Sequence, residues 1–306
     1  MALRLVAAAQ SDPGLQREQN EDASHIQMSE DASRATGLFI VADGMGGYHA
    51  GEVASQLAVE TIRDALQPLL GPTANQPTVR LGKRRKGKGG KHDDKHDDKH
   101  DEKGASADAE SDLAGGAPTQ ILAESLAMEQ YGERLREAVE QSSEVIFKYG
   151  REHKDANGLG STLTAALVVD AQAYVANVGD SRTYLLRDGK LQRITRDHSL
   201  VARLVEPGQI DADEVYDHPN RNLIYRSLGA GTADVDVDIF TEQLRAGDML
   251  VLCCDGLWEM VRDPEMREIL TSERDLEKAA KQLVDHANAN GGEDNITVVL
   301  VRCEEA

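Results

Sequence analysis

Aromatic side chains are scarce in this chain, since Phe, Trp and Tyr together make up 4% of its 306 residues. A hydrophobic core must therefore be built from Val, Leu, Ile and Ala, and the 40% hydrophobic content is ordinary for a globular protein. Cysteine is also rare. Two of the three cysteines, Cys253 and Cys254, are adjacent inside an apolar run. This arrangement argues against a disulfide framework and favours a reducing compartment.

Positive charge is in short supply as well. Lys and Arg number 34 against 54 Asp and Glu, so the formal net charge is −20 at pH 7. Nucleic acid is therefore a poor candidate for the main partner, because phosphate backbones are bound by basic surfaces. No hydrophobic run reaches the length of a membrane span, and residues 1–10 are too short for a signal peptide. We expect a soluble, cytoplasmic monomer that binds neither membranes nor nucleic acid.

Residues 38–47 combine an apolar run with a carboxylate and three glycines, in the order LFIVADGMGG. The run is typical of a buried strand. Asp43 follows it directly, so the sheet would fix its carboxylate at an edge that a ligand can reach. The glycines allow a sharp turn and leave backbone carbonyls uncovered, which suits a hard cation with oxygen ligands. Taken alone, the pattern fits an ordinary Asp-Gly turn at least as well.

Hydrophobic spacing predicts the other elements. Helical spacing marks residues 51–70, 121–151, 264–270 and 275–288. Apolar and β-branched runs predict strands at residues 3–9, 23–28, 162–169, 173–178, 183–186, 235–240, 249–254 and 296–302. Asp188-Gly189 is typical of a hairpin turn, and residues 197–231 are polar and irregular. Several strands between long helices predict an α+β layered sandwich and not a βαβ repeat.

Residues 71–118 differ in character from the rest, being dominated by Gly, Pro and Lys with a short repeat at residues 91–101. Such a segment buries too little apolar surface to offset its ordering entropy. We expect a disordered insertion between two helices of a single domain that spans residues 1–306. The histidines of the repeat could bind a metal and the basic block at residues 83–86 an acidic surface, although a solvated linker explains both.

Three segment ends share one pattern. Asp43 and Asp255 each end an apolar strand and precede a glycine, and Asp294 opens the final strand. A single shared site explains the recurrence better than three unrelated turns. Clustered carboxylates repel one another unless a cation compensates them. Ligation by oxygen alone favours Mg²⁺ or Mn²⁺ over Zn²⁺.

Six ordered motifs resemble those of the metal-dependent protein serine/threonine phosphatases, the protein phosphatase 2C family, in its bacterial form. They span residues 12–301 apart from the insertion. The motifs are Arg17-x-x-Asn20-Glu21-Asp22, Asp43-Gly44-Met45-Gly46-Gly47, Gly160-Ser161-Thr162, Val178-Gly179-Asp180-Ser181-Arg182, Asp255-Gly256 and Asp294-Asn295. The resemblance implies a four-layer α-β-β-α sandwich with two central antiparallel sheets and two metal ions at one end.

The resemblance also implies roles for individual residues. Asp43 would bridge the two ions and the Gly44 carbonyl would bind the second, while Asp255 and Asp294 would hold the first. Glu21 and Asp22 would bind waters on the metals, and Arg17 would hold the substrate phosphate through its planar fork of donors. A third ion, found in bacterial members, would be bound by Asp155 and Asp197 together with Asp255.

The implied reaction is hydrolysis of phosphoserine and phosphothreonine in proteins by a metal-bridging hydroxide, which opposes serine/threonine kinases in signal transduction. The partners would be phosphorylated proteins, including a kinase or its substrates. Met45 stands where some relatives carry a histidine, and methionine has no proton to donate to the leaving group. Residues 197–231 would form a flap in which Arg221 and Arg226 face the substrate, unless they only make surface salt bridges.

Two other classes of function remain open. A non-catalytic relative could serve as a binding module, but it would not need Asp43, Asp255 and Asp294 together. A metal-dependent phosphohydrolase could instead act on small molecules. Asp180 is interpreted as a structural residue of its turn, and Cys253 and Cys254 as core residues.

Overall fold

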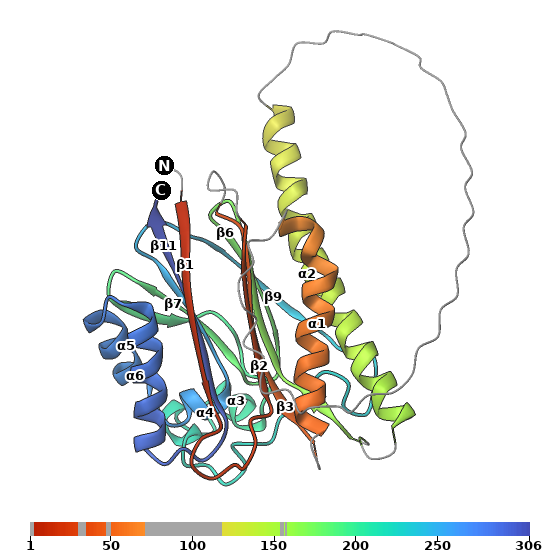
Figure 1. Ribbon diagram of the computed structural model, residues 1–306, viewed down its shortest axis with the longest axis vertical. Coiled ribbons are helices and arrows are strands. Elements are labelled where there is room, and N and C mark those ends of the chain that lie inside the picture. Colours follow the sequence, from red (N-terminus) through yellow and green to blue (C-terminus); the bar gives the residue numbers. More distant parts are fainter. Residues whose placement is uncertain (1–2, 30–34, 47–49, 71–117, 154–155, 157) are drawn as a thin grey trace, which may run out of the picture.

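The computed structural model describes residues 3–29, 35–46, 50–70, 118–153, 156 and 158–306, together with the backbone alone for helix residues 118–129. The predicted insertion and Asp155 lie outside the described residues. Within the described part, two antiparallel sheets lie face to face, with helices on both outer sides (Figure 1). This arrangement confirms the four-layer sandwich.

The first sheet has the strand order β1-β11-β10-β7-β8. Its strands are β1 (Leu3–Asp12), β7 (Arg182–Arg187), β8 (Lys190–Arg193), β10 (Met249–Cys253) and β11 (Ile296–Glu305). The second sheet has the order β2-β3-β5-β6-β9, with β4 paired to β3. Its strands are β2 (Asp22–Met28), β3 (Gly37–Met45), β4 (Gly160–Ser161), β5 (Leu163–Val169), β6 (Gln172–Val178) and β9 (Asp238–Gln243).

Strand β3 is apolar at every position from residue 38 to residue 42, because both of its faces are covered. Leu38 and Ile40 lie in the cluster that faces the helices, and Phe39 and Val41 lie in the cluster between the two sheets. All four side chains are fully buried, because β3 is covered on both faces. The helices on this side are α1 (Ala50–Leu70) and α2 (Pro118–Glu152).

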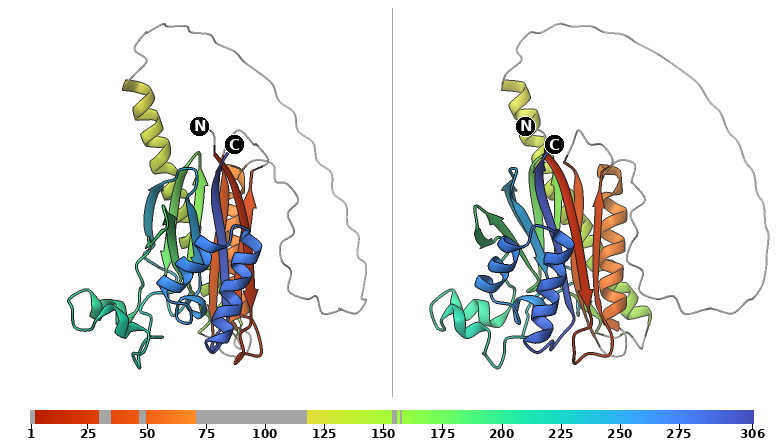
Figure 2. Two further views of the ribbon diagram at one scale, coloured as in Figure 1. Left: turned by 90° about the vertical axis from the view of Figure 1, so that its left-hand side faces the viewer. Right: turned by 60° about the vertical axis from the view of Figure 1, so that its left-hand side comes forward.

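The other outer layer consists of α5 (Asp263–Ser272) and α6 (Leu276–Ala289), which cover β10 and β11. Two views turned about the vertical axis show helices on either side of the sheet pair (Figure 2). The helix α3 (Leu200–Val205) and the chain around it stand out from the sandwich near one end of the sheets. In the part of the chain that the structure describes, none of the helices is long and apolar enough to cross a membrane.

Most predicted elements are present, but the segment at residues 197–231, which was predicted to be irregular, contains α3 and a 3-10 helix at Ala212–Val215, and further elements also differ. The hairpin turn is confirmed, since Asp188 and Gly189 have φ angles of 53° and 72°, as the tight turn between β7 and β8 requires. The sequence reading missed β8 and placed β9 three residues too early. It also missed the short helix α4 (Asp255–Trp258), which begins at one of the predicted metal ligands.

Candidate metal centre

The predicted aspartates meet at one end of the sandwich. Asp22 at the start of β2 lies opposite Asp43 near the end of β3 in the register of the second sheet. Asp255 follows β10 in the first sheet and Asp294 precedes β11, the strand paired with β10. Since both sheets present these ends together, the fold brings four carboxylates from distant parts of the chain into one group.

The pKa values show how strongly these carboxylates affect one another. Burial raises the pKa of Asp43 well above its usual value, and the charges of Asp255 and Asp22 raise it further. Burial likewise raises the pKa of Asp22 to about 7. The pKa of Asp255 is raised by burial and by the charge of Asp294, partly offset by a side-chain hydrogen bond with Asp43. Without a compensating cation, the group favours protonated carboxyls at neutral pH.

Several oxygens of this group have no hydrogen-bond partner. Both carboxylate oxygens of Asp22 and the Oδ1 atom of Asp255 are buried and unpaired, although Thr297 and Cys254 lie beside Asp22. Unpaired buried acceptors are costly, and a hard cation satisfies them with the oxygen ligands it prefers. Among the described residues, no three Asp, Glu, His or Cys side chains already surround a common point. The residues therefore fit Mg²⁺ or Mn²⁺ in donor type and charge, and their side chains would have to turn toward a shared ion.

Gly44 and Gly51 allow backbone segments to approach each other closely. The sharp turn that was predicted for the glycines after Asp43 does not begin at Gly44. Gly44 continues strand β3 and pairs with Ser161. A Cβ atom at Gly44 would lie 2.0 Å from the carbonyl oxygen of Gly51 and 2.6 Å from that of Glu21. A Cβ atom at Gly51 would lie 2.7 Å from the Gly44 carbonyl oxygen. These glycines let the start of α1 and the loop before β2 close against the end of β3.

Arg17 lies on the loop before β2, and its side chain is 54% exposed. Its Nη2 atom donates to Oδ2 of Asp294 at 2.6 Å. The Asn295 side chain holds this loop: its Oδ1 accepts from the Glu21 N–H at 2.7 Å, and its Nδ2 donates to the Gln19 carbonyl at 2.8 Å and to the Pro13 carbonyl at 3.0 Å. Asn295 therefore fixes the loop that carries Arg17 beside the acidic group.

A second arginine ties the segment after α3 to the same end. The Nη2 atom of Arg221 donates to Glu293 at 2.9 Å and its Nε atom to Glu259 at 3.2 Å. The pKa of Glu259 is raised to about 7 by burial and then by the charge of Asp255. Arg226 instead pairs with Asp238 at 2.9 Å. Both arginines of this segment are thus engaged in ion pairs within the chain.

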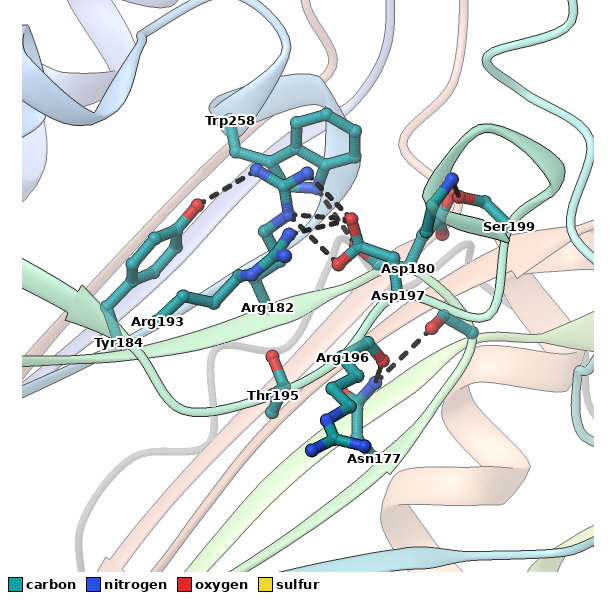
Figure 3. A network of polar contacts seen from close by, with 12 residues as sticks. Asn177, Asp180, Arg182, Tyr184, Arg193, Thr195, Arg196, Asp197, Ser199 and Trp258 are labelled. Atoms are coloured by element: carbon teal, nitrogen blue, oxygen red, sulfur yellow. Dashed lines mark hydrogen bonds and ion pairs between the residues drawn. The ribbon is translucent and has the colours of Figure 1, made fainter. Parts of the chain in front are cut away.

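Asp197, which was predicted to bind a third ion, has a different set of partners. Its carboxylate accepts from Nη2 of Arg182 at 2.7 Å and from Nη1 of Arg193 at 2.9 Å (Figure 3). The Arg182 guanidinium also lies 3.4 Å from the ring centre of Trp258. Two guanidinium groups thus pair with Asp197, whose charge also acts on Asp180, and its role at a third ion stays a prediction.

Asp180, by contrast, joins the acidic group although it was interpreted as a turn residue. It is buried, and its pKa is raised well above the usual value by burial and by the charge of Asp255. Its carbonyl accepts from the Trp258 indole at 2.9 Å. The available signal was its position after the apolar strand β6, one glycine further on. Cys253 and Cys254 are buried and free, as expected of core residues.

The whole chain is similar to known phosphatases. A family model for protein phosphatase 2C matches residues 16–300. The serine/threonine phosphatase stp of Listeria monocytogenes is 35% identical over 295 residues, which are 96% of this chain and 94% of that protein. The catalytic domain of the serine/threonine phosphatase PstP in complex with two manganese ions superposes with a TM-score of 0.69 at 31% identity and covers 99% of this chain and 100% of that chain. Stp1 from Staphylococcus aureus gives a TM-score of 0.71 at 30% identity, with 100% of this chain and 98% of that chain covered.

Proposed function

The chain belongs to the protein phosphatase 2C family, and on that premise we propose that it hydrolyses phosphoserine and phosphothreonine in proteins with Mn²⁺ or Mg²⁺ as cofactor. The observation that carries the proposal is the group formed by Asp22, Asp43, Asp255 and Asp294. These clustered like charges, with unpaired oxygens on Asp22 and Asp255, gain stability from divalent cations. The complete group also disfavours a purely binding role.

We assign the metal-holding roles as follows. Asp43 would contact two ions, with the Gly44 carbonyl on the second. Asp255 and Asp294 would hold the first ion, while Glu21 and Asp22 would complete the surroundings through water. The bound ions supply Lewis-acid chemistry, which activates water and neutralises charge on the phosphate. A third ion would depend on Asp155, which lies outside the described residues.

Arg17 binds the phosphate in this proposal. Its Nη2 atom contacts Asp294, which leaves Nε and Nη1 available to the oxygens of a phosphate at the same edge. A planar guanidinium suits such a group because it donates two parallel hydrogen bonds. The neighbouring Asn295 restricts where Arg17 can reach, since it holds the loop on both sides of that residue.

A panel of substrates separates this function from hydrolysis of small phosphate esters. We expect phosphoserine and phosphothreonine peptides to be hydrolysed with a higher kcat/KM than sugar phosphates or nucleotides. Arg17→Ala should lower kcat/KM for every phosphopeptide by about 10- to 100-fold, since it removes a charge-assisted contact worth about 1.5–3 kcal/mol. Arg4→Ala is the matched control, because Arg4 is an exposed arginine that pairs with Glu304 instead. Equal or faster hydrolysis of small phosphate esters would contradict the assignment.

The substrates are phosphorylated proteins, and we propose that they include a serine/threonine kinase or the targets of one. A cytoplasmic location is supported by the cysteines: Cys253, Cys254 and Cys303 are all free and buried. A reducing compartment preserves such thiols. We also propose that the protein acts as a monomer, which sedimentation of the purified chain would test directly.

A further inference from the structure

In the described part of the chain, exposed large hydrophobic side chains are few and lie on the loop before β2 and in the segment that contains and follows α3. Among the described residues they are Leu15, Leu223, Tyr225 and Leu200, with 70%, 53%, 50% and 36% of their surfaces exposed. Leu15 lies on the loop that carries Arg17, and the others lie in the segment around and after α3. Scattered apolar residues on a surface are normal, but a gathering at one place marks an interaction site.

Both loops border the acidic group at the turn before β11. The Leu15 N–H donates to the Gly292 carbonyl at 2.8 Å, two residues before Asp294. Arg221 donates to the neighbouring Glu293 at 2.9 Å. Leu15 and the segment that follows Arg221 are therefore held by hydrogen bonds to adjacent residues of the same turn.

The segment 221–228 then runs to strand β4, which is paired with the end of β3. At its far end, Leu228 exchanges backbone hydrogen bonds of 2.8 and 3.1 Å with Ser161. Ser161 is paired with Gly44, the residue after Asp43. The segment is thus fixed beside Asp294 at one end and beside Asp43 at the other, with Leu223 and Tyr225 between the two attachments.

Backbone contacts hold this segment in place while its apolar side chains stay exposed. The Leu200 N–H donates to the Leu223 carbonyl at 2.8 Å, and the Tyr225 N–H donates to the His198 carbonyl at 2.9 Å. The Arg203 guanidinium lies 5.0 Å from the centre of the Tyr225 ring. A surface ordered in advance loses less entropy when a partner binds it.

We propose that Leu223 and Tyr225, together with Leu200 and with Leu15 on the neighbouring loop, form a docking surface for the substrate polypeptide, where they bind apolar side chains that flank the phosphorylated residue. The proposal rests on the proposed phosphatase function. Arg17 contacts Asp294 and Arg221 contacts the adjacent Glu293, so a substrate whose phosphoresidue is held at Arg17 lies beside this segment.

The charged side chains beside the segment are paired within the chain. Glu259 and Glu293 would attract basic side chains, but both already accept from Arg221. Arg226 further along the segment is likewise paired with Asp238. Three carboxylates share two guanidinium groups here, and beyond this excess negative charge the exposed leucine and tyrosine side chains are what the segment offers to a substrate.

Steady-state kinetics on matched phosphothreonine peptides tests the proposal. The peptides share one backbone and carry either Leu or Ser at the two positions on each side of the phosphothreonine. We expect wild type to prefer the Leu peptide about tenfold in kcat/KM, mainly through KM. Leu223→Ser and Tyr225→Ser should each reduce that preference by a factor of about three to five. Leu223→Met and Tyr225→Phe should keep it. The matched control is Asn222→Ser, at an exposed polar neighbour in the same segment.

An aryl phosphate measured in parallel separates this proposal from the proposed function. If Leu223→Ser and Tyr225→Ser hydrolyse the aryl phosphate as fast as wild type but lose the preference for the Leu peptide, the result supports the docking surface. The proposal is overturned if wild type shows no preference, or if Leu223→Ser slows every substrate equally, because the segment then only supports the site. Sedimentation provides a further check: a wild-type dimer that Leu223→Ser converts to a monomer would assign the surface to a second copy of the chain. A wild-type protein that hydrolyses the aryl phosphate but none of the phosphopeptides would reject both proposals.

Discussion

Without metal, the free energy of unfolding should fall as the pH rises from about 5 to about 8, and Asp22 should account for a measurable part of the fall. The unfolded chain ionises Asp22 near its ordinary pKa of 3.8, whereas the folded protein releases that proton near pH 7. Between these values the folded state holds a proton that the unfolded state has already lost. Raising the pH therefore favours unfolding in this window, and the effect levels off above the folded pKa.

The size of the effect follows from the shift. For a single independent group with these two pKa values, linkage gives a loss of about 2.6 kcal/mol between pH 5 and pH 8. Asp22 interacts with Asp255 and Asp294, so the proton is shared among them and about 1–3 kcal/mol is the expected range. Burial lowers the pKa values of His25 and His198, which gives the opposite slope at lower pH. A comparison with Asp22→Asn cancels these histidine contributions.

The assay is urea unfolding in EDTA, followed by far-ultraviolet circular dichroism at four pH values. The difference in unfolding free energy between wild type and Asp22→Asn should change by about 1–3 kcal/mol across the series, to the disadvantage of wild type at pH 8. Saturating Mn²⁺ should stabilise wild type more at pH 8 than at pH 5, because cations bind the ionised carboxylates. A difference that stays flat with pH, or that favours wild type at high pH, would refute the reasoning.

Three further predictions concern the surroundings of the metal centre. Gly44→Ala should destabilise the protein by about 2–4 kcal/mol in urea unfolding, since its Cβ would collide with the Gly51 carbonyl; a loss under 0.5 kcal/mol would contradict the close approach. Asn295→Ala breaks three hydrogen bonds to the loop that carries Arg17. It should cost about 2–4 kcal/mol and raise KM for phosphopeptides, and an unchanged KM would contradict the positioning role. Deleting residues 71–117, with a short linker in their place, should leave aryl phosphate hydrolysis within about twofold of wild type if they are a linker; a large loss would show that they contribute to the site.

Local patterns were sufficient to predict the elements and the main acidic residues. Asp43, Asp255 and Asp294 lie at the ends of strands, and the apolar runs next to them in the sequence identify those positions. Several strands between long helices predicted the layered sandwich. The continuous apolar run at residues 38–42 predicted a buried strand, and β3 is indeed covered on both faces. These features depend on neighbours in sequence, so the sequence alone contains them.

Contacts between distant side chains were not predictable in the same way. Asp180 is buried beside the acidic group, whereas the Asp197 carboxylate forms ion pairs with Arg182 and Arg193. Asp180 follows the apolar strand β6 and Asp197 lies in a polar stretch, but neither position indicates which side chains the folded chain places beside it. The Asn295 contacts with the loop before β2 likewise join residues more than 250 positions apart.

The most direct test of the metal-dependent reaction is phosphopeptide hydrolysis by wild type and Asp43→Asn, each assayed with EDTA and with a titration of Mn²⁺. The exposed Asp234→Asn is the matched control, since it makes the same change of charge away from the acidic group. We expect wild type and Asp234→Asn to be active only with Mn²⁺, whereas Asp43→Asn should lose at least about two orders of magnitude in kcat/KM at every Mn²⁺ concentration. Full activity of wild type in EDTA, or of Asp43→Asn with Mn²⁺, would contradict it.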